Sequence, residues 1–171
     1  EVTLNLPSML KAAGLIQQRV PDVRFAIAAF KDSQAEFARQ RVAESGLNIE
    51  VHLHRTAELI ELATCCLAVS GSVSLELLYH LKPSVIIYRA TPFGIWLQRQ
   101  MRKTRYITLV NLLASDEPFV ERATDAITQA AAADEVLFPE HLTVDEPAEK
   151  IAQQLEGWLT DESARQQRIG Q

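Results

Sequence analysis

Cysteine, glycine and aromatic residues are all scarce in this chain of 171 residues. It has two cysteines and six glycines, and only 6% of its residues are Phe, Trp or Tyr. Cys65 and Cys66 are adjacent in an apolar run, so they are poorly placed to bridge each other, which argues against a disulfide-stapled secreted scaffold. We expect two buried thiols in a reducing compartment, without a reactive role, because no basic residue adjoins them.

Long apolar runs and an excess of basic charge are also missing. No run approaches the roughly 18 apolar residues of a membrane-spanning helix. The 17 Lys and Arg residues are outnumbered by 22 Asp and Glu residues, for a net charge of −5. Such a chain is a poor binder of nucleic acid, whose phosphates are held by clustered basic side chains. With 47% hydrophobic and 23% charged residues, the composition is that of one globular domain.

Helical and strand patterns alternate along most of the sequence. Several of the expected strands are apolar on both faces, which is typical of a parallel sheet covered by helices on both sides. The fold class expected is therefore α/β, with a three-layer, Rossmann-like parallel sheet. Ser33 and Glu36 predict a capping box at the start of one helix. Helices are expected at 4–20, 33–46, 56–64, from the Ser-Gly-Ser turn to about 81, at 92–103 and at 144–159, and strands within 21–30 and at 48–54, 65–70, 84–89 and 106–110.

One of the six glycines lies between two serines, Ser70 and Ser72, where a strand meets a helix. Ligands of open α/β sheets bind outside the carboxyl ends of the strands. Gly71 would let a ligand approach the backbone, the first amides of the helix lack helical partners, and Ser72 and Ser74 add hydroxyl donors. With Glu76 accepting from a ribose diol, this turn predicts a nucleoside diphosphate site. The alternative is an ordinary turn in which Ser72 caps the helix and Glu76 is a surface acid.

Several further motifs follow this turn in series. After "SGSVSLE" come "KP", an apolar strand that ends at Tyr88 and Arg89, and the segment "KTRYITLVNLL". This order resembles the lipid-A-disaccharide synthases, in which a Ser-Gly-(Thr or Ser)-x-(Thr or Ser)-Leu-Glu turn precedes Lys-Pro, Tyr-Arg and Lys-x-x-Tyr-(Val or Ile)-x-Leu-x-Asn-Leu-Leu. The opening "EVTLNLPSMLKAA" resembles the segment after that family's Gly-Ser-Arg turn, and "FPEHL" (138–142) is a weaker echo. The chain is thus expected to be a piece of something longer.

The resemblance implies the C-terminal, nucleotide-sugar-binding half of a GT-B type glycosyltransferase. The N-terminal acceptor domain, with any catalytic base, would lie outside the chain. Such an enzyme moves 2,3-diacylglucosamine from UDP to 2,3-diacylglucosamine 1-phosphate and releases UDP, and no cofactor or metal is expected. Carried over residue by residue, the contacts would be Ser70, Gly71, Ser72 and Ser74 with the diphosphate, Glu76 with the ribose, and Tyr88, Arg89 and Asn111 around them.

The sequence departs from the family pattern in two places. Val110 stands where the family usually has Pro, and residues 115–137 resemble an insertion before "FPEHL". We expect one UDP-sugar-binding domain over residues 1–160, followed by a polar tail at 161–171. Another UDP-sugar enzyme of the GT-B fold, such as a UDP-N-acetylglucosamine epimerase or a peptidoglycan glycosyltransferase, stays an alternative, and so does a non-catalytic α/β binding module.

The helix expected at 92–103 combines an apolar face with clustered basic charge. The family's substrates are lipids, so this segment could contact acyl chains or anionic headgroups. The alternative is a core helix with a solvated face. The resemblance implies a cytoplasmic protein, peripheral on the inner face of the inner membrane of a Gram-negative-type bacterium. The residues proposed for this contact are Phe93, Trp96, Leu97, Arg99, Arg102 and Lys103.

His52 and His54 share one face of an expected strand, which raises the question of a metal site. Neither has a carboxylate or cysteine partner at ligand spacing in the sequence, so a metal role is disfavoured. His54 ends its strand on the expected ligand side, so the sequence allows it to contact the uracil or a phosphate.

Overall fold

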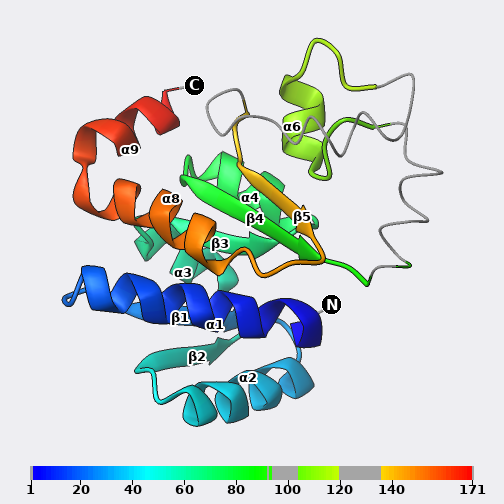
Figure 1. The fold of residues 1–171 in the computed structure, drawn as a ribbon. Helices are drawn as coiled ribbons and strands as arrows, with labels where there is room; N and C mark the ends of the chain where they lie inside the picture. The colour runs from blue at the N-terminus through cyan, green and yellow to red at the C-terminus, as the bar shows by residue number, and fades with distance from the viewer. Residues whose placement is uncertain (1, 92, 94–103, 120–135, 171) are drawn as a thin grey trace.

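The computed structural model describes residues 2–91, 93, 104–119 and 136–170 (Figure 1). Helices and parallel strands alternate along the chain, which confirms the α/β class. The helix expected at 92–103 lies outside the described residues except for Phe93, and so does most of 115–137. The elements are α1 (Val2–Arg19), β1 (Phe25–Ala29), α2 (Asp32–Ser45), β2 (Ile49–Leu53), α3 (Thr56–Leu62), β3 (Cys66–Val69), α4 (Val73–Tyr79), β4 (Ser84–Arg89), α6 (Leu109–Ala114), β5 (Glu140–Thr143), α8 (Ala148–Thr160) and α9 (Glu162–Ile169).

The five described strands are divided between two parallel sheets. One has the order β1-β2 and the other the order β3-β4-β5. Helices α1 and α8 pack side by side against one face of the three-stranded sheet, and α4 and α6 lie on its other face (Figure 1). The layers are those expected of a Rossmann-like domain.

The centre of the larger sheet is β4, and its apolar residues are buried on both faces. Val85, Ile86 and Ile87 are each 0% exposed. Val85 and Ile87 pack with side chains of α1 and α8, whereas Ile86 packs with Leu77 of α4 and Val110 of α6. A strand that is buried on both sides has no polar face, which is why its sequence shows a continuous apolar run.

Two local predictions were wrong in detail. The start of α2 is fixed by Gln34, whose Oε1 accepts from the backbone N–H groups of Phe30 and Lys31, and not by a Ser33–Glu36 box. Residues 106–110 form no strand: they lead into α6, with Thr108 as the capping residue. The third strand of the larger sheet is instead β5. Among the described residues, no helix is both long and apolar enough to cross a membrane.

Candidate functional site

The Ser70–Gly71–Ser72 turn lies directly after β3, at the carboxyl end of the three-stranded sheet. Gly71 and Ser72 are exposed, and a Cβ added to Gly71 would meet no atom within 4 Å. Within the described part of the chain, no acceptor pairs with the N–H groups of Gly71, Ser72 or Val73. The turn therefore offers three successive backbone donors beside open space, which is a suitable arrangement for an anion.

The start of α4 lacks the Ser72 cap that an ordinary turn without a ligand would be expected to have. Ser72 has helical backbone angles, and its side chain makes no capping hydrogen bond. Ser74, expected to face the diphosphate, is instead 0% exposed, and its Oγ donates to the carbonyl oxygen of Gly71 at 2.9 Å. A hydroxyl that points toward the sheet needs an internal partner, and the turn's own carbonyl supplies one. Ser74 therefore shapes the turn and leaves the exposed positions to Gly71 and Ser72.

Ser70 connects the turn to the segment before α6. Its N–H donates to the carbonyl oxygen of Ile87 at 3.4 Å, which continues the pairing with β4. Its Oγ donates to the carbonyl oxygen of Ile107 at 3.1 Å. The Ser70 hydroxyl thus holds two chain segments together and is already committed within the protein.

Asn111, expected on a loop that closes the site, lies in α6 and is 2% exposed. Its Nδ2 donates to the Phe138 carbonyl oxygen at 2.7 Å and to Glu140 Oε1 at 2.8 Å, and its Oδ1 accepts from the Phe138 N–H at 3.0 Å. All of these partners are internal. The side-chain amide of Asn111 therefore fixes α6 against the start of β5.

Glu140 is the polar residue of this region that the sequence did not single out. Besides the Asn111 amide, its carboxylate accepts from the backbone N–H groups of Ile107 (2.7 Å) and Thr108 (2.9 Å) and from Thr108 Oγ1 (2.5 Å). These donors come from a segment about 30 positions earlier, so no local pattern indicates the contact; its one signal was the weak "FPEHL" resemblance. Glu140 binds the N–H of Ile107, and the carbonyl oxygen of Ile107 accepts from the Ser70 hydroxyl. Glu140 therefore helps to hold the Ser70–Gly71–Ser72 turn in place.

Tyr88 and Arg89 end β4 and point to opposite faces of the sheet, as successive strand residues do. Arg89 lies on the α1 side, where its guanidinium donates to Ser8 Oγ and to the Val144 carbonyl oxygen, both at 3.0 Å. Tyr88 is half-buried, and by alternation it shares the face of Ile86, which packs with α4 and α6. Tyr88 therefore lies on the same face of the sheet as α4, the helix that follows the turn. The side chain of Arg89 is instead bound to Ser8 of α1 and to Val144.

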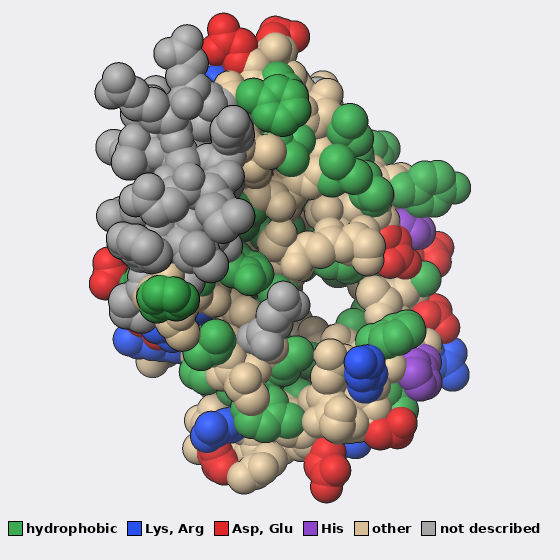
Figure 2. Space-filling view, turned by 90° about the vertical axis from the view of Figure 1, so that its right-hand side faces the viewer, with side chains coloured by type: hydrophobic (Ala, Val, Ile, Leu, Met, Phe, Trp, Pro, Cys, Tyr) green, Lys and Arg blue, Asp and Glu red, His purple; other side chains and the backbone are tan. Residues whose placement is uncertain are grey.

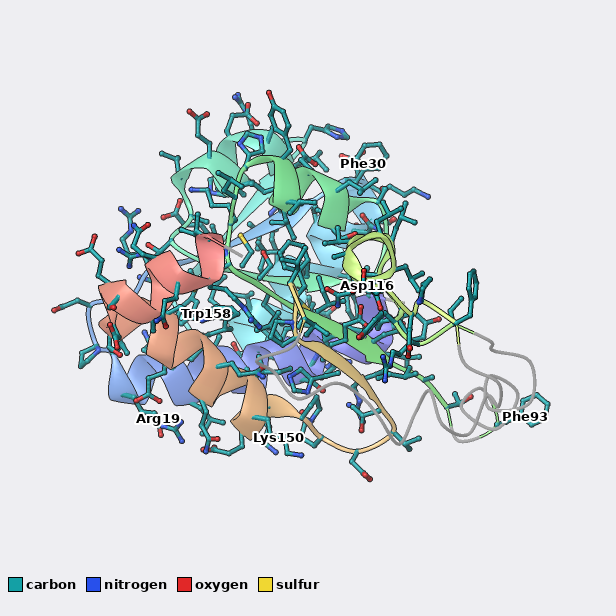
Figure 3. All side chains as sticks on the ribbon, turned by 90° about the horizontal axis from the view of Figure 1, so that it is seen from above. Arg19, Phe30, Phe93, Asp116, Lys150 and Trp158 are labelled. Carbon is teal, nitrogen blue, oxygen red and sulfur yellow. The ribbon has the colours of Figure 1, made fainter. Side chains whose placement is uncertain are left out.

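The apolar and basic segment predicted for lipid contact is largely outside the described residues, which include neither Trp96, Leu97, Arg99, Arg102 nor Lys103. Phe93 is described and is 69% exposed. Figure 3 shows it at the outer edge of the molecule, on the opposite side from Trp158, which is buried between α8 and its neighbours. Phe93 is therefore not a core residue.

One carboxylate that the sequence prediction overlooked, that of Glu50, lies beside the first of the two strand histidines. His52 Nε2 lies 3.1 Å from Glu50 Oε2, and the ring of His54 packs edge-on against Phe30. Over the described residues, no group of three or more His, Cys, Asp or Glu side chains is arranged to hold a metal ion.

Cys65 and Cys66 are half-buried and not fully buried as predicted, yet their thiols are expected to be unreactive in the folded protein. Burial raises the pKa of Cys65 to about 12 and that of Cys66 to about 11, because the thiolate loses its hydration. At about pH 8 only a very small fraction of either would be ionised, and the thiolate is the reactive form. Titration with a disulfide reagent should detect no rapid reaction in buffer and two thiols after unfolding in guanidinium chloride. Rapid labelling of either thiol in the native state would contradict this.

Comparison with known proteins places these features in a family context. The family model for lipid-A-disaccharide synthetase matches residues 1–167. The chain is 31% identical over 161 residues to the lipid-A-disaccharide synthase of Histophilus somni (strain 2336), a match that covers 93% of this chain and 36% of that protein. It is 30% identical over 136 residues to the synthase of Coxiella burnetii (strain Dugway 5J108-111), with coverage of 80% and 35%. For the synthase of Salmonella paratyphi B (strain ATCC BAA-1250 / SPB7) the identity is 33% over 119 residues, with coverage of 68% and 31%. The chain thus spans about a third of the length of these relatives.

Proposed function

Since the chain belongs to the lipid-A-disaccharide synthetase family, we propose that it forms the UDP-sugar-binding half of a glycosyltransferase of lipid A biosynthesis. The whole enzyme would transfer 2,3-diacylglucosamine from UDP to 2,3-diacylglucosamine 1-phosphate and release UDP. The observation that carries the proposal is the exposed Ser70–Gly71–Ser72 turn at the carboxyl end of β3, with three N–H groups unpaired among the described residues.

In this proposal the diphosphate lies against the backbone of Gly71, Ser72 and Val73. The absence of a side chain at Gly71 allows the close approach, and the exposed hydroxyl of Ser72 adds a further donor. As the bond from the sugar to the diphosphate breaks, negative charge grows on the departing UDP. Fixed backbone donors stabilise such charge well because they need no reorganisation during the reaction.

The other members of the predicted set have different roles in the proposal. Glu76 is partly exposed in the first turn of α4, where it would accept hydrogen bonds from the ribose hydroxyls. Tyr88 lies on the same side of the sheet as α4 and is the remaining candidate contact. Ser70, Ser74 and Asn111 would act as positioning residues, because their side chains hold the turn and α6 in place.

Replacing Gly71 by Val should lower the affinity for UDP by about tenfold or more, since the side chain would occupy the space of a phosphate. The substitution should leave the folded state intact, because a Cβ at this position meets no protein atom within 4 Å. Glu76→Ala should weaken binding by about tenfold through loss of the ribose contact. Calorimetric titration of the protein from the full reading frame with UDP measures both effects.

The matched control is Gly157→Val in α8, because a Cβ at Gly157 also meets nothing within 4 Å. This variant should bind UDP like the parent protein. Equal affinities for UDP in the parent, Gly71→Val and Glu76→Ala proteins would show that UDP does not bind at this turn.

The remaining parts of the proposal concern the acceptor and the membrane. The binding site for the acylated glucosamine 1-phosphate and any catalytic base would lie outside residues 1–171. This chain alone should therefore have no transferase activity. We further propose peripheral attachment to the cytoplasmic face of the inner membrane, supported by the lipid nature of the family's substrates and by the pattern of residues 92–103. The family match favours this reading over a UDP-N-acetylglucosamine epimerase or a peptidoglycan glycosyltransferase. Transferase activity of the full-length protein would exclude a non-catalytic module.

A further inference from the structure

The outer sides of the two helical layers differ in character. On α1 and α8, which the structure describes in full, Leu4 is the only large hydrophobic residue that is exposed. The opposite layer, formed by α3, α4 and α6, exposes many more, and Figure 2 shows hydrophobic side chains gathered over the upper part of the molecule. Seven such residues lie in these helices or within two positions of their ends and form what we call the apolar face: Leu62, Leu75, Leu78, Tyr79, Leu81, Leu109 and Leu113.

Helix α4 is apolar both toward the sheet and away from it. Ser74 and Leu77, three positions apart, are buried against the sheet. Leu75, Leu78 and Tyr79 have the spacing of one helical side and are exposed. A surface helix normally carries polar residues on its outer side. The sequence of α4 is therefore that of a helix covered on both sides.

Helix α6 has the same arrangement beside it. Val110 and Asn111 are buried, whereas Leu109 and Leu113, one turn apart, are exposed. Val110 packs in one cluster with Leu77 of α4, on the same side of the sheet. The outer sides of α4 and α6 therefore adjoin.

The end of α3 extends the apolar face on the other side of α4. Lys82 Nζ donates to the carbonyl oxygens of Glu61 and Ala63, both at 2.8 Å. These two bonds hold the end of α3 beside the residues that follow α4. Leu62 and Leu81 are thereby brought to the same surface.

The size of the apolar face suits a stable protein interface. Its seven residues are each between 36% and 83% exposed. With about 200 Å² for a fully exposed side chain of this size, they present roughly 800 Å² of apolar surface. The largest apolar patch of a monomer is usually about 300–600 Å², whereas each partner in a stable complex buries about 800 Å².

The charges near the apolar face suit a second copy better than an anionic membrane. Neither α4 nor α6 contains Lys or Arg, and the exposed Asp116 and Glu117 follow α6 closely. Attachment to anionic lipid needs clustered basic residues. Two copies of the apolar face would instead place apolar residues against apolar residues, with no like charges opposed at the centre.

We propose that the protein forms a homodimer in which the apolar faces of two copies pack together about a twofold axis. The interface is isologous, so α4 and α6 of one copy pack with the same helices of the other. The Ser70–Gly71–Ser72 turn lies at the carboxyl end of the sheet and not on the outer side of the helices. The dimer therefore leaves the turn accessible, and the proposal does not depend on the nucleotide site.

Sedimentation equilibrium of the full-reading-frame protein, without nucleotide, tests the dimer. The parent protein should have the mass of a dimer at protein concentrations between about 1 and 100 μM. Tyr79→Glu and Leu113→Glu should each weaken dimerisation by at least about a hundredfold, because the twofold axis buries each new charge twice in an apolar interface. Both residues are exposed, so the variants should keep the fold, which circular dichroism checks.

Gln18→Glu is the matched control, since it adds the same charge at an exposed position of α1, on the opposite helical layer. This variant should dimerise like the parent protein. A monomeric parent protein would overturn the proposal, and so would dimers of equal affinity in the parent and all three variants. Co-sedimentation with phosphatidylglycerol vesicles examines the lipid alternative. Vesicle binding by a monomeric parent protein that Tyr79→Glu abolishes would assign the apolar face to a membrane and would also overturn the dimer.

Discussion

Replacing Glu140 by Ala should lower the free energy of unfolding by about 3 kcal/mol, because it leaves several neutral donors, two of them on buried residues, without their acceptor. Its carboxylate accepts four hydrogen bonds, from Ile107, Thr108 and Asn111. Thr108 and Asn111 are at most 2% exposed, so water cannot easily replace the lost acceptor. Denaturant unfolding of the full-reading-frame protein measures the change.

Two companion variants make this prediction specific. Glu140→Gln keeps one acceptor oxygen and should lose less stability than Glu140→Ala. Glu117→Ala removes an exposed carboxylate and should change the stability by less than about 0.5 kcal/mol. If Glu140→Ala were as stable as Glu117→Ala, the hydrogen bonds of Glu140 would not be what stabilises the segment before α6.

Ile87→Ala should destabilise the protein by about 3–4 kcal/mol, because it leaves a cavity in the middle of the main core. Ile87 is 0% exposed and packs among residues of α1 and α8 that are themselves buried. Thermal or denaturant unfolding gives the value. Leu62→Ala is the control, since Leu62 is 82% exposed and its truncation should cost little. A loss below about 1 kcal/mol for Ile87→Ala would contradict the central position of β4.

The sequence predicted those parts of the fold that local patterns determine. The helices expected at 4–20 and 33–46 and the strand expected at 84–89 match α1, α2 and β4. Gly46, the last residue of the second range, has a φ of 69°, a left-handed conformation that favours glycine and ends α2. The turn at Gly71 was also located correctly, because a strand, a glycine between serines and a helical period follow one another directly.

The errors arose where distant residues decide the structure. "YITLV" has the composition of a strand, yet the N–H groups of Ile107 and Thr108 are taken by the carboxylate of Glu140, so no ladder forms there. In the same way, Ser74 and Asn111 belong to a family motif that suggests ligand contact, but burial against the sheet commits their side chains to internal partners. Their motif positions are as compatible with shaping the site as with touching the substrate.

The central claim is that the amide donors after β3 bind a diphosphate, and an NMR titration of the full-reading-frame protein with UDP tests it most directly. The account predicts that the N–H resonances of Gly71, Ser72 and Val73 shift with the largest amplitudes and saturate together, while that of Gly157 stays in place. Saturable binding that leaves these three resonances unmoved would contradict it.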